Sequence, residues 1–295
     1  MAQVSQHLAR NLLRMRGWRS HRVYTAAGRV HVLEGENPRG AEGTVVMLHG
    51  LGSASVHWWS VMGAMRQSAR RVILPDMPGH GFSDMPPEGL APETLRAGLV
   101  DSLDQRVREP AVLVGNSMGG LGAIEYALAR PERVRGLVLM SPGGAPMRDD
   151  DIAPFVERFR VRSHRDALEF VDRLFAHRAP MRHALAWGVR RTFAQPGIST
   201  LLQSLSPAHL LAAEQLAALR VPVVLIWGRG DRVLPDAHRE FFVRHLPRGT
   251  RVVEPAHVGH SPYLEDPALV IREVRGLLTA LSAPRLRPGA SLPAL

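Results

Sequence analysis

The chain contains no cysteine among its 295 residues. Disulfide bonds, thiolate nucleophiles and cysteine-ligated zinc or iron–sulfur clusters are therefore excluded within it. Lysine is absent as well, so the 37 residues counted as lysine or arginine are all arginines. Without lysine there is no Schiff-base chemistry, no Walker A lysine and no Ser-Lys catalytic dyad.

Aromatic residues are scarce, at 5% of the chain, although the net charge is +10. No basic, aromatic-rich sheet or recognition helix stands out, so we expect no nucleic-acid partner. The positive charge is unevenly placed. Residues 1–33 hold six arginines and no acidic residue, residues 34–144 hold ten arginines against twelve acidic residues, and residues 221–282 hold eight against seven. The part of the chain that would carry catalysis is thus close to neutral.

Long apolar runs are also missing. None approaches the ~20 residues needed to cross a bilayer, and the N-terminus lacks the uninterrupted apolar segment of a secretory signal. We therefore expect a soluble, cytoplasmic protein.

Residues 1–20 predict a basic N-terminal helix. Apolar residues recur in it at helical spacing: Val4, Leu8, Leu12 and Met15. A surface helix packed on the protein's own domain is the favoured interpretation. The alternatives are peripheral contact with an anionic membrane, with Trp18 at the interface, and a mitochondrial transit peptide.

Short β-rich runs alternate with helix-like stretches, a pattern that predicts a mostly parallel sheet with helices on both faces. The expected strands span residues 30–33, 44–48, 72–74, 111–114, 134–140, 223–227 and 251–253. The expected helices span residues 55–68, 92–108, 118–130, 236–246 and 267–281. A further run at 22–24 is expected to form a hairpin with 30–33.

The alternation stops between residues 142 and 219, which carry helical patterns and no strand. Such a stretch is too long for an ordinary connection, and it predicts a helical cap inserted into an α/β core of residues 21–141 and 220–282. Large apolar side chains in the cap would shape a substrate pocket or pack the cap onto the core: Phe155, Phe159, Leu174, Phe175 and Trp187. Residues 283–295 show no periodicity, and we expect a mobile tail.

One short motif stands between an expected strand and an expected helix. Residues 115–119 read G-N-S-M-G, which is a G-x-S-x-G pattern. In a chain of this composition about one-tenth of such a match is expected by chance. A strand-to-helix turn this tight strains its central residue, and side chains on either side would collide there. The pattern predicts that Ser117 is a nucleophile on an elbow whose shape depends on Gly115 and Gly119.

A serine hydroxyl needs a base, and the base needs an orienting acid. Asp231 follows the strand expected at 223–227, and His260 follows the one at 251–253. The carboxyl ends of parallel strands meet at one edge of a sheet, which brings these residues towards Ser117. Their chain order, serine, aspartate, histidine, is the order that accompanies a nucleophile elbow.

Other residues compete for these roles. Asp236 follows a proline and is interpreted as a helix N-cap, His257 is a less favoured base, and His80 lies in a tight glycine turn that indicates a structural role. The histidines lack metal-ligand spacings such as H-E-x-x-H, so we expect no metal and no cofactor.

An ester carbonyl attacked by serine becomes an oxyanion, which needs two N–H donors. The N–H of Met118, at the start of the helix after the nucleophile, is one candidate. The other is the N–H of Leu51, after the strand at 44–48, where His49 and Gly50 form the supporting turn and glycine lets the chain bend.

From about residue 23 to residue 281 the chain resembles the α/β-hydrolase superfamily. The matching motifs occur in the expected order: HGLG, LPDMPGHGFSD, GNSMGG, GRGDRVLP and GHSPYLEDP. The resemblance implies an α/β-hydrolase fold with a helical cap, an acyl-enzyme mechanism without cofactor, and a small-molecule or lipid ester as substrate.

Within the superfamily the chain resembles two branches. Bacterial capped lipases and esterases are favoured, and hydrolases that cleave carbon–carbon bonds in ring-fission products are the alternative. The second branch leads us to expect an aromatic residue after the catalytic histidine, where Ser261 stands. A non-catalytic binding protein of this fold is a third hypothesis.

Overall fold

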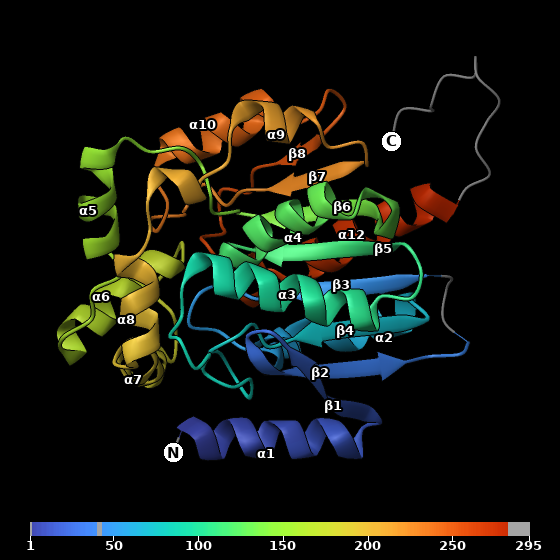
Figure 1. Ribbon diagram of the computed structural model, residues 1–295, viewed down its shortest axis with the longest axis horizontal. Helices are drawn as coiled ribbons and strands as arrows, with labels where there is room; N and C mark the ends of the chain where they lie inside the picture. The colour runs from blue at the N-terminus through green and yellow to red at the C-terminus, as the bar shows by residue number, and fades with distance from the viewer. Residues whose placement is uncertain (1, 40–42, 283–295) are drawn as a thin grey trace.

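The computed structural model describes residues 2–39 and 43–282. Eight strands form one sheet: β1 (Trp18–Thr25), β2 (Gly28–Glu36), β3 (Thr44–Leu48), β4 (Arg71–Pro75), β5 (Ala111–Asn116), β6 (Val134–Met140), β7 (Val223–Ile226) and β8 (Arg251–Val253). Their order across the sheet is β1-β2-β4-β3-β5-β6-β7-β8 (Figure 1). The pairs β1–β2 and β2–β4 are antiparallel, and the five pairs from β4 to β8 are parallel. The expected α/β fold class is confirmed.

Successive residues of β3 point to opposite faces of the sheet and enter two cores. Val46 and Leu48 belong to the first core, and Val45 and Met47 belong to the second. The first core is covered by α3 (Pro92–Arg106), α4 (Met118–Ala129, followed by the turn η2, Pro131–Arg133) and α10 (Asp236–His245). The second core is covered by η1 (Ser55–Ser60), α2 (Met62–Ser68), α11 (Pro262–Glu265) and α12 (Pro267–Ser282). The single helix expected over 55–68 is thus a 3₁₀ turn followed by a short α-helix.

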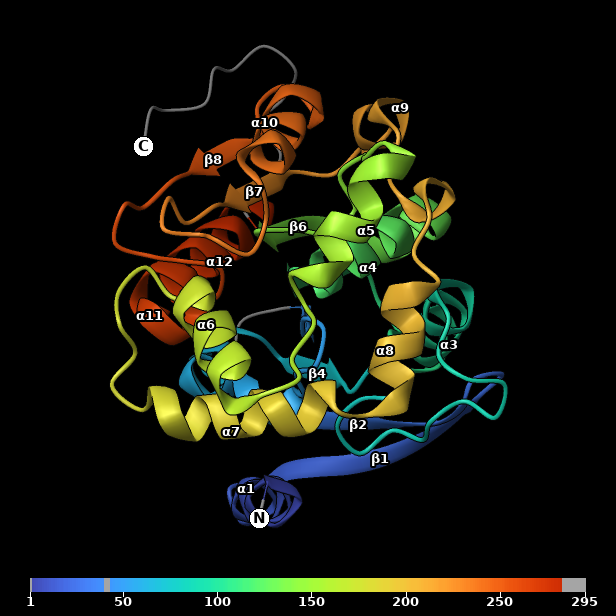
Figure 2. The ribbon, with the colours of Figure 1, turned by 90° about the vertical axis from the view of Figure 1, so that its left-hand side faces the viewer.

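Helices alone fill the chain between β6 and β7. They are α5 (Asp149–Glu157), α6 (His164–Leu174), α7 (Arg182–Phe193), α8 (Pro196–Gln203), η3 (Pro207–His209) and α9 (Ala213–Ala217). Figure 2 shows α5 to α8 grouped at one end of the sheet. The chain leaves and rejoins the sheet at adjacent strands: Leu137 N–H donates to Pro222 O (3.0 Å), and Ser141 N–H donates to Ile226 O (2.9 Å).

The N-terminal helix α1 (Ala2–Met15) is shorter than the expected 1–20. It ends there because Gly17 adopts a positive φ of 84°, and β1 begins at the next residue. β1 and β2 form the expected hairpin, which extends from the pair Trp18–Gly35 to the pair Thr25–Gly28. No helix in the described ranges combines the length and apolar character needed to cross a membrane. The tail expected at 283–295 lies outside the described residues.

Candidate active site

Ser117 is the single residue between β5 and α4. Its φ is 54°, and only one other non-glycine residue in the described ranges has a positive φ. Neighbouring backbone holds this conformation: Ser117 N–H donates to Met140 O (3.0 Å), and Ser117 O accepts a hydrogen bond from Gly143 N–H (2.9 Å). A strained backbone persists only where surrounding bonds determine it, and such residues concentrate at functional sites.

The glycines on either side of Ser117 leave no room for side chains. A Cβ added to Gly119 would overlap the carbonyl oxygen of Leu48, and one added to Gly115 would overlap the carbonyl oxygen of Gly119. The turn therefore requires glycine at both positions for steric reasons, because each contact is with rigid backbone.

His260 and Asp231 are both buried and lie in direct contact. His260 Nδ1–H donates to Asp231 Oδ2 at 2.8 Å, since an ionised carboxylate only accepts. Burial alone would raise the pKa of the Asp231 carboxyl, but His260 and the N–H groups of Val233 and Leu234 hold that pKa below its usual value. The carboxylate fixes the tautomer of His260 in which Nε2 is free to accept a proton.

Backbone and side-chain bonds connect the turn of Ser117 to the loop of His260. Asn116 Nδ2 donates to His260 O (2.8 Å), and His260 N–H donates to Leu174 O in the helical insertion (2.8 Å). Among the hydrogen bonds of the described residues, none joins Ser117 Oγ to the His260 ring. Contacts of this kind are commonly loose in free enzymes and tighten around substrate.

The competing residues lie elsewhere. His257 is exposed, and its Nε2 is 2.9 Å from Asp266 Oδ2. His80 Nδ1–H donates to Pro78 O (2.9 Å) in a buried turn. Asp236 is the first residue of α10 rather than its N-cap, which is Pro235, so the N-cap interpretation is wrong. Across the described ranges no three His, Asp or Glu side chains are grouped as metal ligands.

The loop after β3 is held by His49. This ring is fully buried; its Nδ1–H donates to Gly50 O (2.8 Å), and its Nε2 accepts from Met77 N–H (3.0 Å). Burial lowers the pKa of His49, which keeps the ring neutral and suits it to both bonds. Among the hydrogen bonds of the described residues none is donated by the N–H of Leu51 or Met118, and both residues line the same pocket as Ser117.

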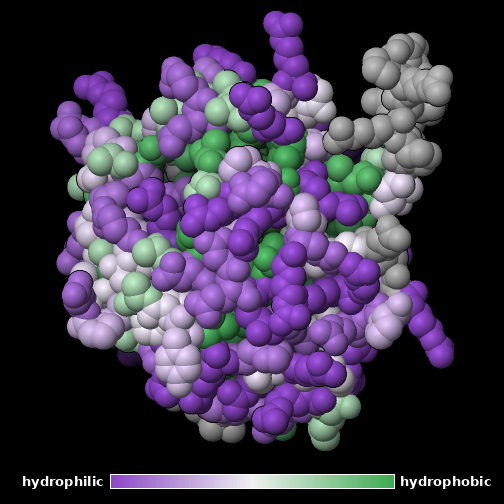
Figure 3. Space-filling view, turned by 45° about the vertical axis from the view of Figure 1, so that its right-hand side comes forward, coloured by the Kyte–Doolittle hydropathy of each residue, from purple (hydrophilic) through white to green (hydrophobic). Residues whose placement is uncertain are grey.

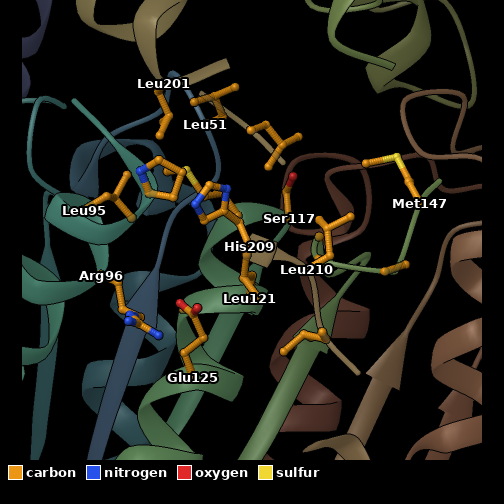
Figure 4. A pocket seen from close by; sticks show the side chains of 18 of the residues that line it. Leu51, Leu95, Arg96, Ser117, Leu121, Glu125, Met147, Leu201, His209 and Leu210 are labelled. Carbon is orange, nitrogen blue, oxygen red and sulfur yellow. The ribbon is translucent and has the colours of Figure 1, made fainter. Parts of the chain in front are cut away.

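Ser117 lies in the wall of a cavity of about 350 Å³. Figure 4 shows its hydroxyl directed into this space among leucine side chains. Leu121 and Glu125 follow Ser117 at intervals of four residues, so the pocket runs along one face of α4. Of the large cap residues considered above, Phe155 and Phe159 line the pocket, whereas Leu174, Phe175 and Trp187 do not.

The pocket has a polar end that the sequence did not reveal. Arg96 from α3 and Glu125 from α4 lie there, as Figure 4 shows. His209, which also lines the pocket, has its Nε2 2.6 Å from Glu93 Oε1. Burial raises the pKa of Glu125 to about 6, against the opposing influence of Arg96 and His209. The only sequence signal for the polar end was the position of Glu125 eight residues after Ser117, which places both on one face of the helix.

Comparison with known proteins gives consistent matches. The family model described as "Alpha/beta hydrolase family" matches residues 45–273. A pimeloyl-[acyl-carrier protein] methyl ester esterase of Nitrosomonas europaea is 32% identical over 76% of this chain and 90% of its own. A 2-hydroxy-6-oxo-2,4-heptadienoate hydrolase of Pseudomonas putida is 31% identical over 82% of this chain and 91% of its own. The structure of a carboxylesterase from Bacillus subtilis is 20% identical, covers 94% of this chain and 98% of its own, and has a TM-score of 0.75, which shows a shared fold. The chain belongs to the alpha/beta hydrolase family.

Proposed function

We propose that the chain is a serine hydrolase that cleaves carboxylic esters through an acyl-enzyme on Ser117. The observation that carries the proposal is the position of Ser117: a strained elbow residue in the wall of a pocket, tied through its neighbour Asn116 to the loop of a histidine that contacts a buried aspartate.

Each proposed step follows from the positions of these groups. His260 Nε2 takes the proton of Ser117 while Oγ forms a bond to the ester carbonyl carbon, and the carbonyl π electrons move to oxygen. The oxyanion accepts hydrogen bonds from the N–H groups of Leu51 and Met118. When the C–O bond to the alcohol breaks, His260 returns the proton to that alcohol. Water repeats the sequence and releases the acid, while Asp231 stays ionised and stabilises the imidazolium.

The pocket supports an acyl chain of medium length with a polar end. The eight residue-to-residue steps from Ser117 to Glu125 cover about 12 Å along the direction of α4. Apolar side chains line this path, including Leu51, Leu121 and Leu201, before Arg96 and Glu125 are reached. The relative from Nitrosomonas europaea is named for a methyl ester of a dicarboxylic acyl group, and such a chain carries polar atoms at both ends. That likeness supports a substrate of this class.

The proposal is tested with a fluorophosphonate probe and p-nitrophenyl esters of increasing acyl length. We expect the probe to label the wild-type chain at one site. Ser117→Ala should abolish labelling and lower kcat roughly a millionfold. His257→Gln is the matched control and should keep full activity. A wild-type chain that is folded, unlabelled and inactive on every ester would overturn the proposal.

Carbon–carbon bond hydrolysis is a second candidate, favoured by the similarity to the Pseudomonas putida hydrolase. The same triad would serve it. Comparison of kcat/KM for the ester series and for a vinylogous diketo acid separates the two reactions, and a preference for the diketo acid would replace the esterase proposal.

A further inference from the structure

The apolar stripe of α1 faces away from the protein. Leu8, Leu12 and Met15 are 59%, 45% and 77% exposed. Leu13, on another face of the helix, packs against the second core. The helix packs on the protein's own body as expected, but through Leu13 and not through this stripe. The side chain of Val4 lies outside the described residues. Three large apolar side chains in a row on one exposed helix face need an occupant.

α1 is attached to the body of the protein, although its apolar stripe is exposed. The guanidinium of Arg10 lies 4.3 Å from the centre of the Phe82 ring. At the other end of the helix Arg66 Nη1 donates to Arg16 O (2.7 Å). Trp18, which the membrane alternative placed at the interface, is buried in the second core and anchors the start of β1. The helix is thus held on the body with its stripe outward.

A second helix presents the same kind of surface. α7 carries three exposed apolar side chains, Met181 at its N-cap, Leu185 and Trp187, while Ala186 faces inward. Arg191 lies over the Trp187 ring at 5.7 Å. Both ribbon views place α7 and α1 at the same end of the molecule, the lower edge in Figures 1 and 2.

Both helices lie in chain segments whose own charged residues are all arginines. Residues 1–33 hold six arginines, residues 173–213 hold five, and neither segment contains Asp or Glu. On the face shown in Figure 3, by contrast, apolar side chains occur as small patches broken up by polar ones. Three of these arginines pair with carboxylates from outside the two segments: Arg19 with Glu36, Arg29 with Asp84 and Arg182 with Asp172. The remaining excess of arginines beside exposed apolar side chains fits a surface that is anionic outside and apolar beneath. A second copy of this chain would bring arginines against arginines.

We propose that the outward faces of α1 and α7 form a docking surface for an anionic phospholipid bilayer. α1 lies in the plane of the headgroups, Leu8, Leu12 and Met15 enter the acyl boundary, and the arginines contact lipid phosphates. The contact is peripheral, and it does not depend on the proposed esterase activity.

Co-sedimentation of the full chain with vesicles tests this surface. The vesicles contain phosphatidylcholine alone or with about a third phosphatidylglycerol. We expect binding at least about tenfold tighter to the anionic vesicles, weakened when NaCl rises from about 0.1 M to about 0.5 M. The triple variant Leu8→Gln/Leu12→Gln/Met15→Gln should bind anionic vesicles at least about tenfold more weakly.

A matched control uses exposed apolar residues at the other edge of the molecule. Val243 in α10 and Val252 in β8 are also exposed, and Val243→Gln/Val252→Gln should bind as the wild type does. Unchanged thermal unfolding verifies that both variants fold. Absent vesicle binding, equal affinity for neutral vesicles, or a triple variant that binds like the wild type would each overturn the proposal. The proposal would also be overturned if the wild type bound no lipid but formed a dimer, and the triple variant were a monomer. The stripe would then join two copies of the chain.

Discussion

The side-chain amide of Asn116 donates a hydrogen bond of 2.8 Å to the backbone carbonyl of His260, across 144 residues of chain. The same amide donates to Met140 O at 3.1 Å, so both of its hydrogens are used. Because Asn116 directly precedes Ser117, this bond sets where the loop of the proposed base sits relative to the proposed nucleophile.

Replacement of Asn116 by alanine should therefore change turnover more than substrate binding. We expect kcat to fall about tenfold to a hundredfold with KM nearly unchanged, and the free energy of unfolding to fall by about 1–3 kcal/mol, because the carbonyl of His260 loses this donor and the carbonyl of Met140 keeps only Ser117 N–H. Steady-state kinetics and urea unfolding measure the two effects. A loss of stability with kcat unchanged would show that Asn116 has a structural role only and does not position the proposed base.

Asp231 and Asp236 follow the same strand, and their substitutions should differ sharply. Asp231→Asn leaves His260 Nδ1 without its carboxylate, which disfavours the tautomer needed for proton transfer, and we expect kcat to fall by about 10⁴. Asp236→Asn should leave kcat within about twofold, because Asp236 stands in the first turn of α10. Equal losses in the two variants would contradict the assignment of the acid.

Gly119 and Gly276 provide a matched pair for the packing of the elbow. Gly119→Ala drives a methyl group into the carbonyl oxygens of Leu48 and His49, and the free energy of unfolding should fall by about 3 kcal/mol or more. In Gly276→Ala, in α12, the added methyl group has no atom within 4 Å, and the free energy of unfolding should rise by up to about 1 kcal/mol. Urea unfolding compares them, and similar effects at both positions would refute the steric explanation.

Glu125 should make stability depend on pH. Its pKa in the folded protein is raised to about 6 from 4.5, so the folded state keeps this proton at pH values where the unfolded state has released it. The free energy of unfolding should then decrease by on the order of 2 kcal/mol as pH rises from about 4.5 to about 6. Glu125→Gln removes this decrease. Parallel pH–stability curves for the two proteins would show that the carboxyl is not perturbed.

Some elements could be predicted to the residue and others could not. β3, β6 and β8 match the expected bounds because each is a short β-rich run with clear limits. The order of Ser117, Asp231 and His260 also followed from sequence, since each lies in the loop or turn that follows its own strand. These are local properties of the chain, and local patterns record them well.

The orientation of α1 and the polar end of the pocket were not predictable in this way. Periodicity shows that Leu8 and Leu12 share a face, but the same pattern arises whether that face points inward or outward. Arg96, Glu125 and His209 come from α3, α4 and the helical insertion, and only the tertiary fold brings them to one cavity. Burial and long-range packing decide both features, and neither leaves a local signal.

The helical insertion departs from β6 and returns at β7, which are neighbours in the sheet. Its sequence and length can therefore vary without changing the strand register beneath Ser117, provided that a carbonyl replaces that of Leu174, which accepts the N–H of His260. This stretch supplies part of the pocket wall, including Phe155 and Leu201, whereas the proposed nucleophile, base and acid lie outside it. Exchange of this stretch between relatives should therefore change that part of the pocket wall while the proposed reacting groups keep their positions.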